Sequence, residues 1–190
     1  MSLLIDYLKD KNDNTNYKLV NTIMLLEDAL LRYDEFLKAY TTDYITSFYV
    51  QSRYLIEFVV NLNILLNEDE EVILFAPFWP EYKVLAEKAN GKIVIVKADN
   101  NFNPDMEDFE NKISEQTKVV VINSPNNPTG VIYSEQVIKQ IADILKRKQK
   151  EYQHDIYLLS DEPYRELIYG NEKYPFVTNY YDNSLVAYSF

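Results

Sequence analysis

The chain has 190 residues, 47% of them hydrophobic, which suffices for one substantial core, so one α/β domain with at most a small appendage is expected. Its formal charge is −11, with acidic residues spread along the chain, which argues against nucleic acid or an anionic membrane as the main partner. The absence of cysteine excludes a disulfide framework and a thiolate metal site, and the single histidine, His154, leaves little for metal chemistry, so no metal site is predicted.

The apolar segments of the chain are short. None reaches the roughly 18 residues of a membrane-spanning helix. The N-terminal sequence MSLLIDYLKDKNDN also lacks the basic region of a secretory signal. We therefore expect a cytoplasmic protein with no membrane partner.

The first 66 residues carry a helical pattern. Apolar residues recur at helical spacing in residues 17–40, and residues 52–66 are typical of a buried helix that leads into the first strand. The sequence therefore predicts a mainly helical N-terminal segment over residues 1–66.

From residue 71 onward, short apolar runs alternate with helical patterns. The runs are rich in β-branched and aromatic residues and have the length of buried strands; they cover residues 71–75, 92–98, 118–123, 155–160 and 184–190. This alternation predicts an α/β fold over residues 67–190, a three-layer domain with a mostly parallel sheet and helices on both faces.

Capping signals mark the helices between these strands. A helical pattern over residues 79–90 ends at Asn90-Gly91, and Asn103-Pro104 predicts the N-cap and first turn of a short acidic helix. Ser134 predicts the N-cap of a longer helix over residues 135–152, whose apolar residues form one stripe.

Three of the predicted strand ends carry unusual residues, and ligands of open parallel sheets bind at such ends. Trp79 follows the first strand, Asn127 lies in NSPNNPTG (residues 123–130), and Asp161 and Tyr164 follow the fourth strand. Together they suit a planar heteroaromatic ring: the indole stacks, the amide and phenol donate to a ring oxygen, and the carboxylate pairs with a protonated ring nitrogen. A ring protonated in this way is an electron sink, which carbanion chemistry on an amino acid requires.

Each of these residues also has a purely structural interpretation. Trp79 alone is more often a core or helix-capping aromatic, while Asn127-Pro128 and Asp161-Glu162-Pro163 alone are turn signals. Their occurrence together, after three strand ends, favours the cofactor site.

The segments FAPFWPEY, NSPNNPTG and SDEPYRELIY resemble the class I aminotransferases, pyridoxal-phosphate enzymes of fold type I, and in particular their aspartate-aminotransferase-like branch. The resemblance covers residues 62–190. It implies that Trp79 stacks on the pyridine ring of pyridoxal 5'-phosphate, that Asn127 and Tyr164 donate to its phenolic oxygen, and that Asp161 pairs with its ring nitrogen. It also implies cis peptides before Pro77 and Pro128, amino acid and 2-oxo acid substrates, and a homodimer.

Two parts of the family pattern are missing from the chain. The lysine that binds the cofactor covalently is expected just after Phe190, so the resemblance implies no catalytic residue within this sequence. Arg53 takes the place of a glycine in the expected phosphate-binding turn, where a long side chain hinders close approach of the backbone to phosphate. We therefore expect a partial cofactor-binding domain that is inactive alone.

Other functions remain open at this point. A degenerate relative that serves only as a binding or interaction module keeps the same motifs, and a fold type I lyase or decarboxylase uses the same grip on the cofactor. An unrelated flavodoxin-like or nucleotide-binding domain is disfavoured, because such folds need glycine-rich loops and the chain has only three glycines.

Overall fold

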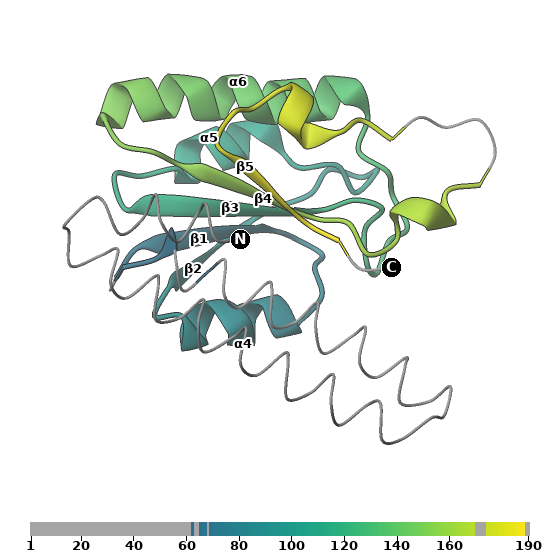
Figure 1. Ribbon diagram of the computed structural model, residues 1–190, viewed down its shortest axis with the longest axis horizontal. Helices are drawn as coiled ribbons and strands as arrows, with labels where there is room; N and C mark the ends of the chain where they lie inside the picture. The colour runs from purple at the N-terminus through teal and green to yellow at the C-terminus, as the bar shows by residue number, and fades with distance from the viewer. Residues whose placement is uncertain (1–61, 63–64, 68, 170–173, 189–190) are drawn as a thin grey trace, which may run out of the picture. The chain divides into compact units, whose positions relative to one another are not determined.

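The described residues of the chain, in a computed structural model, are 62, 65–67, 69–169 and 174–188 (Figure 1). The chain divides into two compact units, Met1–Ile64 and Leu65–Phe190, and the helices and strands given below belong to the second. Arg53 and the helix predicted at residues 17–40 lie outside the described residues, as does most of the helix predicted at residues 52–66.

A five-stranded sheet forms the centre of the second unit, and every strand in it pairs in parallel with its neighbours (Figure 1). The spatial order is β2-β1-β3-β4-β5. The strands are β1 (Glu71–Phe75), β2 (Lys92–Val96), β3 (Thr117–Asn123), β4 (Tyr157–Asp161) and β5 (Ser184–Ala187). The prediction of an α/β fold with a parallel sheet is confirmed.

Helices cover both faces of this sheet. Figure 1 shows α4 (Glu81–Lys88) on one face, with α5 (Met106–Lys112) and α6 (Glu135–Tyr152) on the other. Short 3₁₀ helices, η1 (Arg165–Leu167) and η2 (Val177–Asn179), lie between β4 and β5. The three-layer arrangement is therefore also as predicted.

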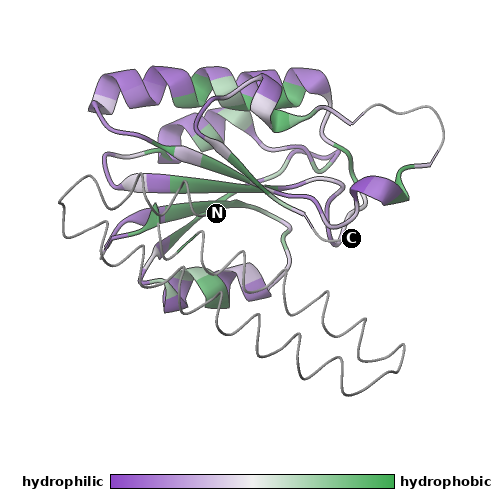
Figure 2. Ribbon diagram, in the orientation of Figure 1, coloured by the Kyte–Doolittle hydropathy of each residue, from purple (hydrophilic) through white to green (hydrophobic). Residues whose placement is uncertain are grey.

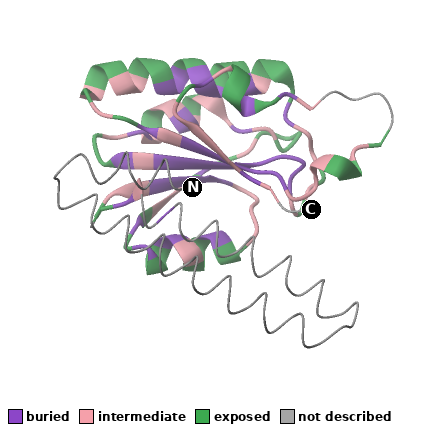
Figure 3. Cartoon of the chain, viewed as in Figure 1, coloured by how far each residue is buried: buried purple, intermediate pink, exposed green. Residues whose placement is uncertain are grey.

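The hydrophobic core of this unit lies between the sheet and the helices α5 and α6. The strands β1, β3 and β4 are apolar and largely buried, β2 and β5 are more exposed, and α6 is polar on its outward side (Figures 2 and 3). The predicted apolar stripe of α6 supplies buried side chains to this core, namely Ile138, Ile141, Ile144 and Leu145. Burial of such side chains is the main favourable term in the stability of the domain.

The two predicted N-caps have different outcomes. Ser134 caps α6 as predicted. The prediction that Asn103-Pro104 opens α5 is wrong, because the side chain of Asp105 accepts hydrogen bonds from the first-turn N–H groups of the helix. Pro104 instead forms an isolated antiparallel bridge with Ala98. The helix therefore begins after Asp105, at Met106.

Several element ends differ from the predicted ones by a few residues. The strand predicted at 92–98 ends at Val96, and the one predicted at 184–190 ends at Ala187. The strand predicted at 155–160 runs instead from Tyr157 to Asp161, so Asp161 is its last residue and does not lie in the loop. That difference matters for the site, because a residue paired in a sheet is held more firmly than one in a turn.

Candidate functional site

The four residues singled out by the sequence lie at or just beyond the carboxyl ends of β1, β3 and β4. Trp79 lies between β1 and α4, Asn127 follows β3, Asp161 ends β4, and Tyr164 comes shortly after it. These parallel strands are neighbours, so their carboxyl ends share one edge of the sheet (Figure 1). Asp161 is 2% exposed, whereas the other three side chains are partly exposed.

Asp161 is a buried carboxylate with neutral donors around it. The hydroxyl of Tyr82 donates to its Oδ2 atom. The side-chain amide of Asn123 donates to the same Oδ2 at 3.2 Å and to the backbone carbonyl of Asp161 at 3.0 Å. Donors of this kind stabilise an ionised carboxylate that is withdrawn from water.

Tyr82 joins this carboxylate to the aromatic side of the site. It lies on α4, is 2% exposed, and comes one helical turn after Trp79. The rings of Trp79 and Tyr82 meet edge to face, with centroids 5.5 Å apart and planes at 90°. The same side chain therefore orients the indole and donates to Asp161.

Asn123 joins the carboxylate to the loop after β3. It is the last residue of β3 and is 5% exposed. Its side-chain oxygen accepts a hydrogen bond of 2.6 Å from the backbone N–H of Asn127. The Nδ2 group of Asn127 in turn lies 3.3 Å from the hydroxyl of Tyr164, so the amide and the phenol predicted to act on one oxygen are adjacent.

The loop that carries Asn127 is closed by its own side chains. The Oδ1 atom of Asn126 accepts from the backbone N–H and the hydroxyl of Thr129 at 3.1 and 2.7 Å. Gly130 has a φ of 73°, in the left-handed region that glycine adopts without strain. The expected cis peptides before Pro77 and Pro128 are present, and Ser124-Pro125 is also cis.

The loop that carries Tyr164 is anchored by a buried acid. Glu162 is fully buried, and its carboxylate accepts from Ser160 Oγ at 2.8 Å and from Arg165 Nη1 at 3.3 Å. The guanidinium of Arg165 also lies 4.0 Å from the ring centre of Tyr188, beyond β5. These contacts tie the segment on both sides of Tyr164 to the sheet.

Sequence reasoning missed Tyr82 and Asn123. Tyr82 is the last residue of the segment FAPFWPEY, and Asn123 is the first residue of NSPNNPTG, but neither was assigned a role. A signal for Tyr82 was its place one helical turn after Trp79, which puts both side chains on one side of a helix. No signal pointed to Asn123, whose contacts depend on how β3 and β4 pair.

These residues fit a planar, charged heteroaromatic ring. The buried carboxylate of Asp161 could hold a proton on a ring nitrogen, and the adjacent Asn127 and Tyr164 could donate to one ring oxygen. The partly exposed Trp79 offers an aromatic face for stacking. By contrast, no group of three or more metal-ligating side chains occurs among the described residues.

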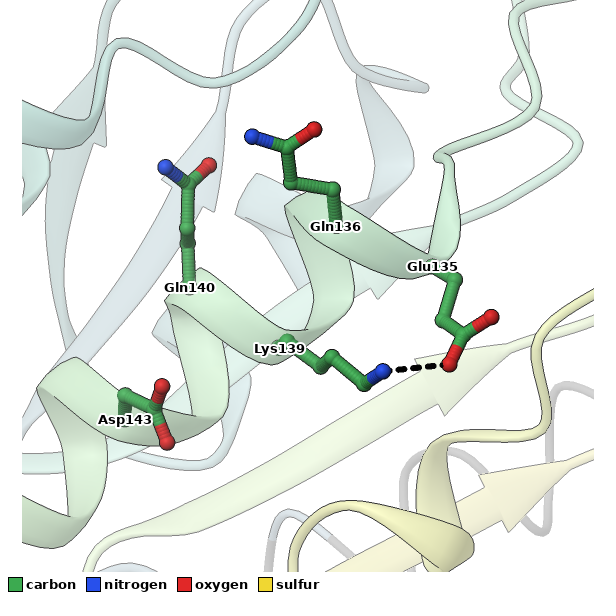
Figure 4. Close-up of a pocket in the computed structure, with 5 residues that line it drawn as sticks. All are labelled: Glu135, Gln136, Lys139, Gln140 and Asp143. Carbon is green, nitrogen blue, oxygen red and sulfur yellow. Dashed lines mark ion pairs between the residues drawn. The ribbon is translucent and has the colours of Figure 1, made fainter.

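A hollow of about 440 Å³ lies elsewhere, on the outward face of α6; Figure 4 shows the side chains that line it. It is lined only by exposed side chains of that helix: Glu135, Gln136, Lys139, Gln140 and Asp143. Lys139 and Glu135 form an ion pair of 2.5 Å in it, which raises the pKa of Lys139. Because one exposed helix supplies every wall, this hollow is a weaker candidate than the strand ends.

None of the helices in the described part of the chain is long and apolar enough to cross a membrane.

Comparison with known proteins places the chain in a family. The model of the family "Aminotransferase class I and II" matches residues 9–190. The aspartate aminotransferase of Bacillus subtilis is 39% identical over 113 residues, which are 58% of this chain and 27% of that protein. The aspartate aminotransferase of Pyrococcus horikoshii is 40% identical over 129 residues, 66% of this chain and 32% of that protein.

Solved structures give the same result. An aminotransferase of Eubacterium rectale superimposes with a TM-score of 0.70 at 43% identity, over 71% of this chain and 34% of its own. The aspartate aminotransferase of Thermus thermophilus with maleate gives a TM-score of 0.60 at 33% identity, over 70% of this chain and 34% of its own. The chain thus spans about a third of these structures and about a quarter to a third of the curated relatives that it matches. The family match extends over almost all of the sequence, and the chain belongs to the class I and II aminotransferases.

Proposed function

We propose that this chain supplies the ring-binding part of a pyridoxal-phosphate-dependent aminotransferase, which moves an amino group from an amino acid to a 2-oxo acid. The observation that carries the proposal is the continuous series of contacts at the strand ends. It runs from Trp79 through Tyr82, Asp161, Asn123 and Asn127 to Tyr164. The names of the relatives, aspartate aminotransferases among them, support the reaction class.

Each side chain of the series has a role in holding the cofactor. Trp79 stacks on the ring, and Asn127 and Tyr164 donate hydrogen bonds to its phenolic oxygen. Asp161, whose burial strengthens its interaction with a cation, holds a proton on the ring nitrogen. When bound, the cofactor supplies an electron-withdrawing ring that stabilises negative charge at the α-carbon of the amino acid.

The proposal extends to the setting of the domain. Residues 67–190 form part of the large cofactor-binding domain, and the complete enzyme works as a homodimer in the cytoplasm. The dimer follows from the family resemblance, and sedimentation of the chain at several concentrations tests whether these residues already associate.

Trp79 provides a direct test, because it is the only tryptophan in the chain. Pyridoxal phosphate is titrated into the protein, and indole emission is recorded with free N-acetyltryptophanamide as the correction for light absorption by the cofactor. We expect saturable quenching. Asp161→Asn removes the charge that pairs with the ring and should raise the dissociation constant about tenfold or more, the loss expected for one charge-assisted hydrogen bond.

Asp143→Asn is the matched control, since Asp143 is an exposed aspartate on α6. It should bind like the unchanged protein. Emission that does not saturate, or equal dissociation constants for Asp161→Asn and Asp143→Asn, would show that the proposed ring site is wrong. Far-ultraviolet circular dichroism of each variant establishes that loss of binding is not loss of fold.

A further inference from the structure

Asn123 uses both ends of its side-chain amide, and each end contacts a different part of the ring site. The oxygen accepts from the backbone N–H of Asn127 at 2.6 Å. The nitrogen donates to the carboxylate and the carbonyl of Asp161 at 3.2 and 3.0 Å. In the sheet, Asn123 and Asp161 are register partners at the ends of β3 and β4.

The chemistry of the partners fixes the orientation of this amide. A backbone N–H only donates, so the side-chain oxygen of Asn123 has to face Asn127. A carbonyl and an ionised carboxylate only accept, so the NH₂ group has to face Asp161. Aspartate, which only accepts when ionised, satisfies one of the two sides, and leucine satisfies neither.

We propose that Asn123 is a positioning residue that sets the carboxylate of Asp161 and the amide of Asn127 relative to each other, so that both engage one cofactor ring. This inference rests on the proposed function. Asp161 acts at the ring nitrogen and Asn127 at the phenolic oxygen, two atoms of one rigid ring, so an error in their spacing weakens both contacts together. Asn123 bonds directly to both residues.

Two substitutions separate the two halves of this role. Asn123→Asp keeps an acceptor for the N–H of Asn127 but turns a second negative charge toward Asp161. Asn123→Leu keeps the branching and the number of side-chain heavy atoms, although its methyl groups are bulkier, and removes both contacts. The matched control is Asn183→Asp, because Asn183 also donates to an aspartate, with its Nδ2 atom 2.9 Å from Asp155 Oδ1, just before β5.

Ring binding is measured by the quenching of Trp79 emission with pyridoxal phosphate. At each pH, the dissociation constant of the variant is divided by that of the unchanged protein. We expect Asn123→Asp to raise the dissociation constant at least tenfold at pH 8. The loss should shrink as the pH falls toward about 5, because a protonated carboxyl can donate to Asp161 again. Asn123→Leu should bind at least tenfold more weakly at every pH, and Asn183→Asp should bind normally.

The contact between Asn123 and the backbone N–H of Asn127 is tested separately. Hydrogen exchange of that N–H is followed by NMR without cofactor. The exchange rate should stay unchanged in Asn123→Asp and rise at least tenfold in Asn123→Leu. Asn123→Asp that binds normally across the pH range, or unaltered exchange in Asn123→Leu, overturns the inference. Failure of the proposed function has a different signature, in which the unchanged protein gives no quenching while the exchange pattern is as expected.

Discussion

Asp161 keeps a carboxylate at 2% exposure on the end of a buried strand, where an ionised group without donors would cost several kcal/mol. Tyr82 and Asn123 supply donors from two different elements, α4 and β3. These donors favour the charged form of the carboxylate and fix its orientation in the folded domain. Because this carboxylate is oriented before the ligand arrives, less of the binding free energy is spent on ordering it.

At this scale, Tyr82→Phe isolates one donor. The substitution removes the hydroxyl that bonds to Asp161 but keeps the ring that packs against Trp79. Because a hydrogen bond to a buried charged group is lost, we expect the free energy of unfolding to fall by about 1.5–3 kcal/mol. Urea denaturation at pH 7 measures it.

Tyr169→Phe is the comparison for this change, since Tyr169 is 86% exposed. It should alter the free energy of unfolding by less than about 0.5 kcal/mol. If both variants unfold alike, the Tyr82 hydroxyl does not stabilise the buried charge.

The residues of the site divide into those that strand ends in the sequence indicate and those whose contacts with Asp161 only the fold indicates. Trp79, Asn127, Asp161 and Tyr164 follow strand ends, and strand ends are readable from short apolar runs. The contacts of Tyr82 and Asn123 with Asp161 join residues 79 and 38 positions apart. Such contacts depend on which strands are neighbours and where α4 packs, and no local pattern encodes either.

At the scale of elements, the reliability of a predicted boundary depends on whether one local signal dominates. β1 was predicted at 71–75 and occurs there, because its apolar run is bounded by acidic residues and by Pro77. The predicted start of α5 was wrong because Asn103-Pro104 and Asp105 offer competing N-cap signals within three residues. Asp105 prevails, since its carboxylate accepts from two N–H groups of the first turn.

The N-cap of α6 allows an element to be tested through one side chain. Ser134 Oγ accepts from the backbone N–H of Val137 at 3.3 Å, and α6 covers much of one face of the sheet. Ser134→Ala leaves that N–H without its side-chain partner and should lower the free energy of unfolding by about 1 kcal/mol. Ser134→Asp supplies an equivalent acceptor and should restore the stability.

Gln136→Ala is the control for the effect of introducing alanine near the start of α6. Gln136 is exposed in the first turn of this helix, and alanine favours helices. It should be neutral or slightly stabilising in the same urea titration. Equal losses for Ser134→Ala and Ser134→Asp would mean that the side-chain acceptor contributes nothing.

At the scale of the whole molecule, buried tyrosines govern how the fold responds to alkali. The chain has 17 tyrosines, and burial raises the pKa of Tyr133 and of Tyr181 well above the ordinary value near 10. Both side chains belong to the hydrophobic core, and the Tyr181 hydroxyl lies 2.6 Å from the carbonyl oxygen of Ile156 and 2.7 Å from the side-chain oxygen of Gln149, so one of these two oxygens accepts its proton. The folded domain therefore keeps these phenols neutral at a pH at which an unfolded chain ionises them.

The sign of the effect follows from that difference. A pKa raised in the folded state contributes stability that is complete below the unfolded pKa near 10 and is lost as the pH rises above it. Each of the two tyrosines should therefore remove about 1.4 kcal/mol from the free energy of unfolding by pH 11. Urea denaturation between pH 8 and pH 11.5 should show a level region that turns downward near pH 10.

Tyr181→Phe separates this contribution from that of paired lysines such as Lys139 and Lys148, whose raised pKa values act in the same direction. The variant loses the hydroxyl contacts, so it should be less stable at pH 8, but its stability should fall less steeply above pH 10. Tyr169→Phe, at an exposed position, should keep the original slope. A slope unchanged in Tyr181→Phe would mean that this phenol ionises as readily in the folded core as in the unfolded chain.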